Sequence, residues 1–291
     1  MSAPRPRTPR PGPRTARLAV VAAGVVLAAL PVAAWAGAFS HPAAEPRTAP
    51  SAGRSRAGLD DPAKKEIAMR LVSSAENSSL DWKDQYKYIE DIEDGRGYTA
   101  GIIGFCSGTG DMLGLVELYT AREPGNVLAK YLPALRKAVG TDSHAGLDPD
   151  FTKDWATAAA DPAFRRAQND ERDRLYFDPA VARGKADGLG ALGQFAYYDA
   201  FVMHGGGDAR TGFGAIREQA LARAEPPARG GDQAAYLEAF LDARVRAMKW
   251  EEAHSDTSRV DTAQRVFLRE GNLNLDPPLD WKVYGDSYHI G

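Results

Sequence analysis

The chain has 291 residues, of which 44% are hydrophobic and 26% charged, so it can form one large domain with a substantial core. Five of the 36 basic residues lie in residues 1–36, which contain no acid. Residues 37–291 therefore hold 31 bases against 39 acids, a net charge of about −8. This charge excludes nucleic-acid binding, which needs clustered Lys and Arg, and suits a cationic partner. A single cysteine, Cys106, and five scattered histidines exclude internal disulfides and predict no metal and no cofactor.

The N-terminus has the order of a secretory signal peptide. Residues 1–17 are basic and proline-rich, an apolar run follows over 18–30, and Ala34-Trp35-Ala36 fits a small-x-small cleavage site. We expect a signal peptide over 1–36, a disordered Ala/Pro-rich linker over 37–57 and a secreted catalytic domain over 58–291. The alternative, an uncleaved membrane anchor, is disfavoured because the apolar run is too short to span a bilayer.

The first predicted elements surround a turn. Asp61-Pro62 is a helix start, and the apolar spacing that follows predicts a helix over 62–76. Trp82, Tyr86 and Ile89 indicate a short helix or ordered turn. Turn residues at 94–97 precede an apolar strand over 98–105, so a small hairpin is expected here.

After this hairpin the apolar periodicity is helical almost throughout. We expect helices near 110–122, 127–139, 148–158, 162–173, 184–204, 211–223, 232–253 and 257–269. The predicted fold class is mainly α (α+β), with one small β-sheet near the N-terminus.

Two carboxylic acids have the arrangement of a glycosidase pair. Glu76 is at the end of the first predicted helix and Asp94 is at the hairpin turn. Glycoside hydrolysis needs one acid to protonate the leaving oxygen and a second carboxylate as base or nucleophile. Spacing alone does not exclude the alternative that Glu76 and Asp94 are ordinary surface acids, since most of the 39 acids must be solvated surface groups.

Longer motifs surround these acids. The segments Val72–Trp82, Tyr88–Thr99 and Gly101–Asp111, with Phe195–Asp199 and Asp256–Thr262 later in the chain, resemble chitosanases of glycoside hydrolase family 46. The similarity is greatest to the secreted enzymes of soil actinobacteria and covers roughly residues 58–291.

This resemblance implies a lysozyme-like fold of two mostly helical lobes around a substrate cleft, with the sheet in the N-terminal lobe. It implies endo-acting, inverting hydrolysis of the β-1,4 glucosamine linkages of chitosan. Glu76 would be the general acid, Asp94 the general base, and Thr99 would help to hold the attacking water. Two positions depart from the family pattern: Glu93 replaces a glycine before the base, and Ser255 replaces an aspartate. We expect Glu93 to point to solvent, where it would have little effect on the pKa of Asp94.

Two charged residues fall among apolar ones in predicted helices. Asp199 lies within an apolar stripe of the helix near 184–204, and Arg244 lies within that of the helix near 232–253. Buried charges must be paired, so we expect these two to be partners. The resemblance adds Arg259 to this network and places it close to Glu76. We expect the three residues to form one buried network that links the two lobes and supports the acid, although a purely structural ion pair is the alternative.

The resemblance also suggests residues that bind substrate: Ser78, Arg96, Asp111, Tyr176, His204 and Glu251. Asp111 could instead cap the helix that starts at Met112, and His204 could cap the end of its own helix. We expect Cys106 to be a small buried hydrophobe. The core should include the three tryptophans that match the family: Trp82, Trp155 and Trp281.

Two other functions compete with chitosan hydrolysis. A lysozyme-like muramidase or lytic transglycosylase shares the fold, but its substrate, peptidoglycan, is anionic and the chain is acidic. A transglycosylase also needs no base, so Asp94 and Thr99 would have no role. The non-enzyme alternative is a chitosan- or wall-binding protein that has lost activity, but such a loss usually removes the acid or the base, and both are present. We therefore expect a monomer whose partner is the cationic polysaccharide chitosan, with no nucleic acid and no membrane after signal cleavage.

Overall fold

The computed structural model describes residues 58–251 and 255–291, which form a mainly helical protein with two small antiparallel sheets. The predicted signal peptide and linker, and His254, lie outside the described residues. No helix in these described ranges is long and apolar enough to cross a membrane.

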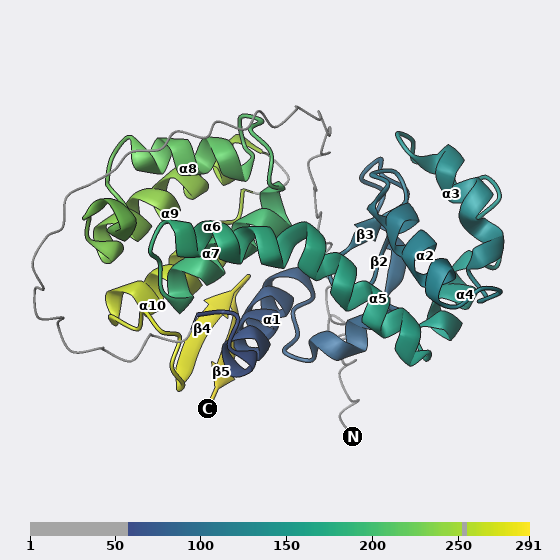
Figure 1. Cartoon of the computed structure of the whole chain (residues 1–291), viewed down its shortest axis with the longest axis horizontal. Helices are drawn as coiled ribbons and strands as arrows, with labels where there is room; N and C mark the ends of the chain where they lie inside the picture. The colour runs from purple at the N-terminus through teal and green to yellow at the C-terminus, as the bar shows by residue number, and fades with distance from the viewer. Residues whose placement is uncertain (1–57, 252–254) are drawn as a thin grey trace, which may run out of the picture.

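The smaller of two bodies contains the predicted sheet (Figure 1). Its strands are β1 (Ile89–Asp91), β2 (Tyr98–Ala100) and β3 (Phe105–Cys106), hydrogen-bonded in that order. The predicted strand over 98–105 is interrupted because Gly101 and Gly104 adopt φ angles of 76° and 74°, which favour glycine. The surrounding helices are η1 (Trp82–Lys87), α2 (Asp111–Arg122), η2 (Ala129–Tyr131), α3 (Leu132–Ala138) and α4 (Phe151–Ala158). They enclose a core that includes Phe105, Leu115 and Trp155.

The larger body holds the remaining helices and the C-terminal hairpin (Figure 1). Its first helix, α1 (Pro62–Glu76), has the predicted bounds because Asp61 accepts hydrogen bonds from the N–H groups of Ala63 and Lys64. The other elements are α6 (Asp178–Ala186), α7 (Ala191–His204), α8 (Phe213–Leu221), η4 (Pro227–Arg229), α9 (Gln233–Trp250), η6 (Val260–Gln264) and α10 (Arg265–Arg269), then strands β4 (Leu279–Val283) and β5 (Asp286–Ile290).

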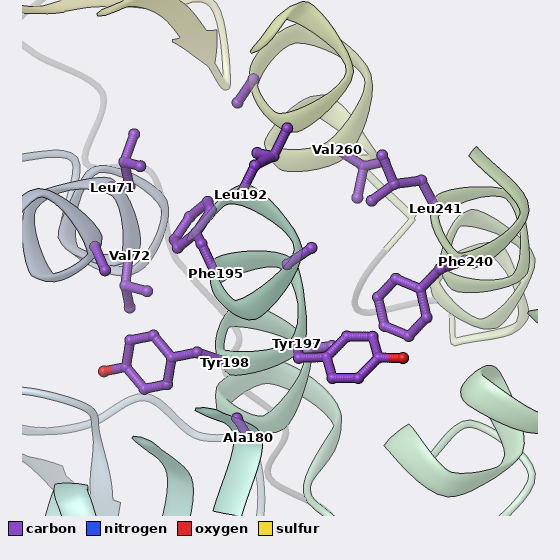
Figure 2. Packing of buried hydrophobic residues seen from close by; sticks show 14 of the residues in the cluster. Leu71, Val72, Ala180, Leu192, Phe195, Tyr197, Tyr198, Phe240, Leu241 and Val260 are labelled. Atoms are coloured by element: carbon purple, nitrogen blue, oxygen red, sulfur yellow. The ribbon is translucent and has the colours of Figure 1, made fainter. Parts of the chain in front are cut away.

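Helix α7 lies at the centre of the larger core. In Figure 2, Phe195 and Tyr198 lie on the side of α7 toward Leu71 of α1, and Tyr197 lies on the opposite side beside Phe240 of α9. All residues of α7 are buried, so the predicted single apolar stripe is wrong: the helix is enclosed on every face. Its start is also later than predicted, at Ala191.

One continuous helical stretch joins the two cores. It runs from α5 (Pro162–Arg172) through η3 (Asp173–Phe177), a π-helical turn, into α6. Phe164 packs in the smaller core and Phe177 in the larger. The prediction ended this helix near 173 and missed α6, which contains Pro179 close to its start. The structure accommodates this proline near the α6 start, just after the π turn.

The second sheet corrects the prediction of one sheet near the N-terminus. Strands β4 and β5 form an antiparallel hairpin, in which Val283 pairs with Asp286. Leu279, Trp281 and Val283 are buried and alternate with exposed residues. This two-residue period was present in the sequence, but it covers only one short strand.

Candidate active site

Glu76 lies at the last position of α1, directly after the core residue Ala75. Its side chain is 6% exposed, and its Oε1 lies 2.8 Å from Nη2 of Arg259. Within the described residues Oε1 accepts no hydrogen bond, so this contact is an ion pair without hydrogen-bond geometry. After Asn77 the chain turns sharply at Ser78, whose φ is 49°. A carboxyl group therefore ends a rigid helix and faces a guanidinium.

Arg259 connects Glu76 to a buried aspartate. Its Nη2 donates to Oδ1 of Asp199 at 2.6 Å, while Arg244 Nη1 donates to Oδ2 at 2.5 Å. Gln264 Nε2 donates to the same Oδ2 at 2.7 Å. We call these five residues, Glu76, Asp199, Arg244, Arg259 and Gln264, the Asp199 cluster.

Charge pairing keeps Asp199 ionised inside the protein. Burial raises the pKa of this carboxyl, but the adjacent Arg244 and Arg259 outweigh burial and hold the pKa well below its usual range. The cluster differs from the prediction in one respect: its elements all belong to the larger body, so it does not link the two lobes. Gln264 was missed, although it follows the apolar Val260 and Ala263 in the same helical turn.

Asp94 is fixed by two consecutive turns. Asp91 Oδ1 accepts the Glu93 N–H at 2.8 Å, and Asp94 Oδ1 accepts the Arg96 N–H at 3.1 Å. The Arg96 side chain folds back onto Asp94, where its Nε donates to Oδ2 at 2.9 Å and Nη2 makes a second contact. Gly97 ends the turn at φ 68°, where a side chain would collide with Ser107.

The predicted substrate residue Arg96 is thus the ion-pair partner of Asp94. Both side chains are mostly buried, at 12% and 10% exposure. One guanidinium nitrogen, Nη1, is buried and has no hydrogen-bond partner in the described chain. This nitrogen is enclosed within the protein, so the structure places Arg96 to hold Asp94 rather than to contact substrate directly. Glu93 is exposed, as expected.

Cys106 lies at the centre of a second group of side chains. Its Sγ is 3.4 Å from Oγ1 of Thr99, which is directly opposite on β2, and its backbone N–H donates to Asp111. Burial and nearby Asp111 raise the pKa of the Cys106 thiol to about 11, with smaller effects of Arg96 and Asp94. We call the residues of this group, Asp94, Arg96, Thr99, Cys106, Asp111 and Tyr176, the Cys106 cluster.

One carboxylate oxygen of Asp111 has a structural function. Oδ1 accepts hydrogen bonds from the Cys106 N–H at 2.9 Å, the Met112 N–H at 3.0 Å and the Thr109 hydroxyl at 2.5 Å. Burial raises the pKa of the carboxyl, and these donors reduce that rise. The helix α2 begins at Asp111 itself, and its N-cap is Gly110.

Tyr176 projects from the π turn η3 and packs against both cores. Burial raises its pKa well above the usual value, and the neighbouring Asp111 and Cys106 raise it further. Tyr176 therefore lies with the Cys106 cluster, between the two bodies. Trp82 also packs against both cores and is only partly buried, whereas Trp155 and Trp281 are core residues.

The other predicted residues lie at ends of elements. Ser78 is exposed beside Tyr288 of β5, and Ser255 is also exposed. His204 and Glu251 mark the C-terminal ends of α7 and α9, which run parallel, since contacts join Gly190 to Gln233 and Asp199 to Arg244. Both residues thus lie at the same end of the larger body.

The two clusters place Glu76 and Asp94 in different environments. Glu76 contacts Arg259, Asp94 contacts Arg96, and the two carboxylates share no ion-pair partner within residues 58–251 and 255–291. Two carboxyl groups held by separate partners can have separate chemical tasks.

Comparison with known proteins identifies the family. The model of glycosyl hydrolase family 46 matches residues 70–279. The chain is 66% identical to a chitosanase of Streptomyces sp. (strain N174) over 95% of this chain and 98% of the relative, and 65% identical to that of Nocardioides sp. (strain N106) over 95% and 97%.

Solved structures of chitosanases also match the fold of this chain. A chitosanase co-crystallised with substrate matches with a TM-score of 0.79 at 62% identity, over 80% of this chain and 99% of the other. A chitosanase of Gynuella sunshinyii in complex with chitotetraose matches with a TM-score of 0.72 at 34% identity, over 78% and 97%. The chain belongs to glycosyl hydrolase family 46.

Proposed function

We propose that this protein is a secreted endo-chitosanase, which hydrolyses β-1,4 glucosamine linkages of chitosan with inversion of the anomeric carbon. Its curated relatives are chitosanases, at 66% and 65% identity over almost their whole length. The acidic charge of residues 37–291 suits a polymer of ammonium groups and disfavours anionic peptidoglycan, the substrate of the alternative muramidase or transglycosylase.

The observation that carries this proposal is the separate fixation of two carboxyl groups, Glu76 by Arg259 and Asp94 by Arg96. An inverting glycosidase needs one acid and one base on opposite sides of the bond, with room for a water molecule. Glu76 transfers its proton to the glycosidic oxygen, whose bond to the anomeric carbon breaks. A water molecule attacks that carbon from the other face, and its proton goes to Asp94.

Thr99 and the remaining predicted residues have supporting functions. Thr99 helps to hold the attacking water beside Asp94. Arg96 holds Asp94 in place, and the second oxygen of Asp111 can accept an ammonium hydrogen. Tyr176, Ser78 and Glu251 are assigned to further contacts with the sugar chain, whereas His204, predicted to bind substrate, is only 2% exposed and can act only through its neighbours.

The Asp199 cluster positions the acid. Arg259 contacts both Glu76 and Asp199, and Arg244 and Gln264 complete the coordination of Asp199. We infer that residues 1–36 direct export, that residues 37–57 are a linker, and that the secreted enzyme is a monomer that needs no cofactor.

A reducing-sugar assay tests this function. The protein should release reducing ends from chitosan and much less from chitin or peptidoglycan. Glu76→Gln is the matched control, because it keeps the shape of the side chain; it should lower turnover by about 10²–10⁴-fold. Activity on peptidoglycan alone would overturn the proposal, and a Glu76→Gln variant with a tenth of normal activity would overturn the assignment of the acid.

A further inference from the structure

The Thr99 hydroxyl belongs to a short chain of hydrogen bonds. Its Oγ1 lies 3.4 Å from Sγ of Cys106, and that Sγ lies 3.2 Å from the carbonyl oxygen of Gly104. Thr99 and Cys106 are paired residues on β2 and β3, so the backbone sets their separation. The Cys106 N–H is bound to Asp111, which fixes the other end.

The direction of these hydrogen bonds follows from the number of protons. A thiol has one hydrogen, and a pKa raised to about 11 keeps this hydrogen on the sulfur at ordinary pH. The Gly104 carbonyl is only an acceptor, so the thiol donates there. Sulfur then has no hydrogen left for Thr99, and the Thr99 hydroxyl must donate to the sulfur.

This direction leaves the Thr99 oxygen as an acceptor only. The residue is 2% exposed, and no other hydrogen bond to Oγ1 is found in residues 58–251 and 255–291. The Thr99 oxygen therefore keeps free lone pairs, which can accept a hydrogen bond from a water molecule.

We propose that Cys106 is a positioning residue, which orients the Thr99 hydroxyl so that it accepts a hydrogen bond from the attacking water. The inference rests on the proposed function, in which Asp94 and Thr99 hold that water. One water hydrogen points to Asp94 and the other to Thr99, so an oxygen lone pair remains free to attack the anomeric carbon. The proton that leaves the water goes to Asp94, and the Thr99 and Cys106 protons stay in place.

The opposite orientation would impair the same reaction. If Thr99 donated its hydrogen to the water, it would occupy one of the lone pairs and make the water less nucleophilic. Loss of the sulfur removes the acceptor that prevents this rotation. The effect should therefore fall on turnover rather than on substrate affinity, because Cys106 is fully buried behind Thr99.

The test compares four enzymes on chitosan: Cys106→Ala, Cys106→Ser, Thr99→Val and the double variant Cys106→Ala/Thr99→Val. Cys106→Ala should lower kcat roughly 3- to 10-fold, the range of one ordinary hydrogen bond, with KM unchanged. Cys106→Ser should retain most of kcat, since its hydroxyl can also donate to Gly104 and accept from Thr99. In the Thr99→Val background, Cys106→Ala should cause no further loss.

Each outcome has a distinct meaning. Unchanged kcat in Cys106→Ala, equal loss in Cys106→Ser, or a full additional loss in the double variant would overturn the inference. Unchanged kcat in Thr99→Val would overturn the assigned function of Thr99, while activity on chitosan in the parent enzyme would still stand. If Cys106→Ala does not fold, a comparison of Cys106→Ser with Cys106→Thr, which adds a methyl group beside the hydroxyl, distinguishes orientation from packing: loss in both contradicts the inference.

Discussion

The carboxylates of Glu76 and Asp199 share one nitrogen atom, Nη2 of Arg259. This nitrogen is 2.8 Å from Oε1 of Glu76 and 2.6 Å from Oδ1 of Asp199. The side chain of Asp199 is only 2% exposed, so solvent cannot replace its protein partners. The position of Glu76 therefore depends on residues that hold Asp199 from the opposite side.

Arg244→Ala should destabilise the protein by roughly 3–5 kcal/mol, because it leaves a buried carboxylate with one guanidinium partner fewer. It should also lower activity, since Asp199 and Arg259 would shift beneath Glu76. Urea unfolding measures the first effect. Arg246→Ala is the control, because this neighbour on α9 is exposed. A loss below about 1 kcal/mol for Arg244→Ala would show that the cluster contributes little.

The loss of stability at low pH should depend in part on Asp199. Burial raises its pKa, yet Arg244 and Arg259 hold it below the unfolded value of about 3.9. A carboxyl with a depressed folded pKa contributes stability above about pH 3.9, and this contribution is lost as the pH falls toward the folded pKa. Melting temperatures from pH 7 to pH 2 should thus fall less steeply at the acid end for Asp199→Asn, although this variant is less stable at pH 7.

Asp276→Asn is the matched control for this titration. Asp276 pairs with Lys64 on the surface, where its side chain is 62% exposed. Its removal should leave the pH profile nearly unchanged. If the melting temperatures of Asp199→Asn and the parent protein fall in parallel as the pH is lowered, protonation of Asp199 does not contribute to the loss of stability in acid.

Glu93→Gly should stabilise the protein by about 0.5–1 kcal/mol. Glu93 has a φ of 59°, a left-handed conformation that is costly for a residue with a side chain. Glu93→Ala keeps this backbone strain and removes the carboxylate, so it should bring no such gain. If both variants are equally stable, the strain is negligible; if both alter the pH profile of activity, Glu93 acts on Asp94 after all.

Asp111→Asn should raise KM for chitosan with little change in melting temperature. The amide keeps an oxygen for the Cys106 and Met112 N–H groups but loses the charge that would attract an ammonium. Asp111→Ala should raise KM and also lower the melting temperature, because three donors lose their acceptor. A normal KM in Asp111→Asn would restrict Asp111 to a structural function.

The sequence was most informative where a signal was local. Asp61-Pro62 marked the start of α1, since Asp61 caps this helix. Helix α6 was missed because the π turn η3, which connects it to α5, has no signal in the sequence. The hairpin β4–β5 was missed because five alternating residues are too few to stand out after a long helical region.

The candidate site was predictable in a similar way. Asp199 and Arg244 stood out as charges among apolar residues, and burial requires such charges to be paired. A neutral residue such as Gln264 gives no comparable signal. The Arg96 contact with Asp94 depends on backbone turns at Asp94 and Gly97, and the Thr99 contact with Cys106 depends on the break in the strand at Gly101. The positions of Glu76 and Asp94 suggested a catalytic pair without deciding it, and the family resemblance assigned the acid and the base.

The most direct test of the account is the anomeric configuration of the first product, followed by proton NMR at early times during chitosan hydrolysis. If Glu76 is the acid and Asp94 activates a water on the opposite face, the new reducing ends must appear first in the α configuration. The β signal should then grow only as the product mutarotates. A first product in the β configuration would mean that a side chain attacks the sugar, and would contradict the proposed function of Asp94.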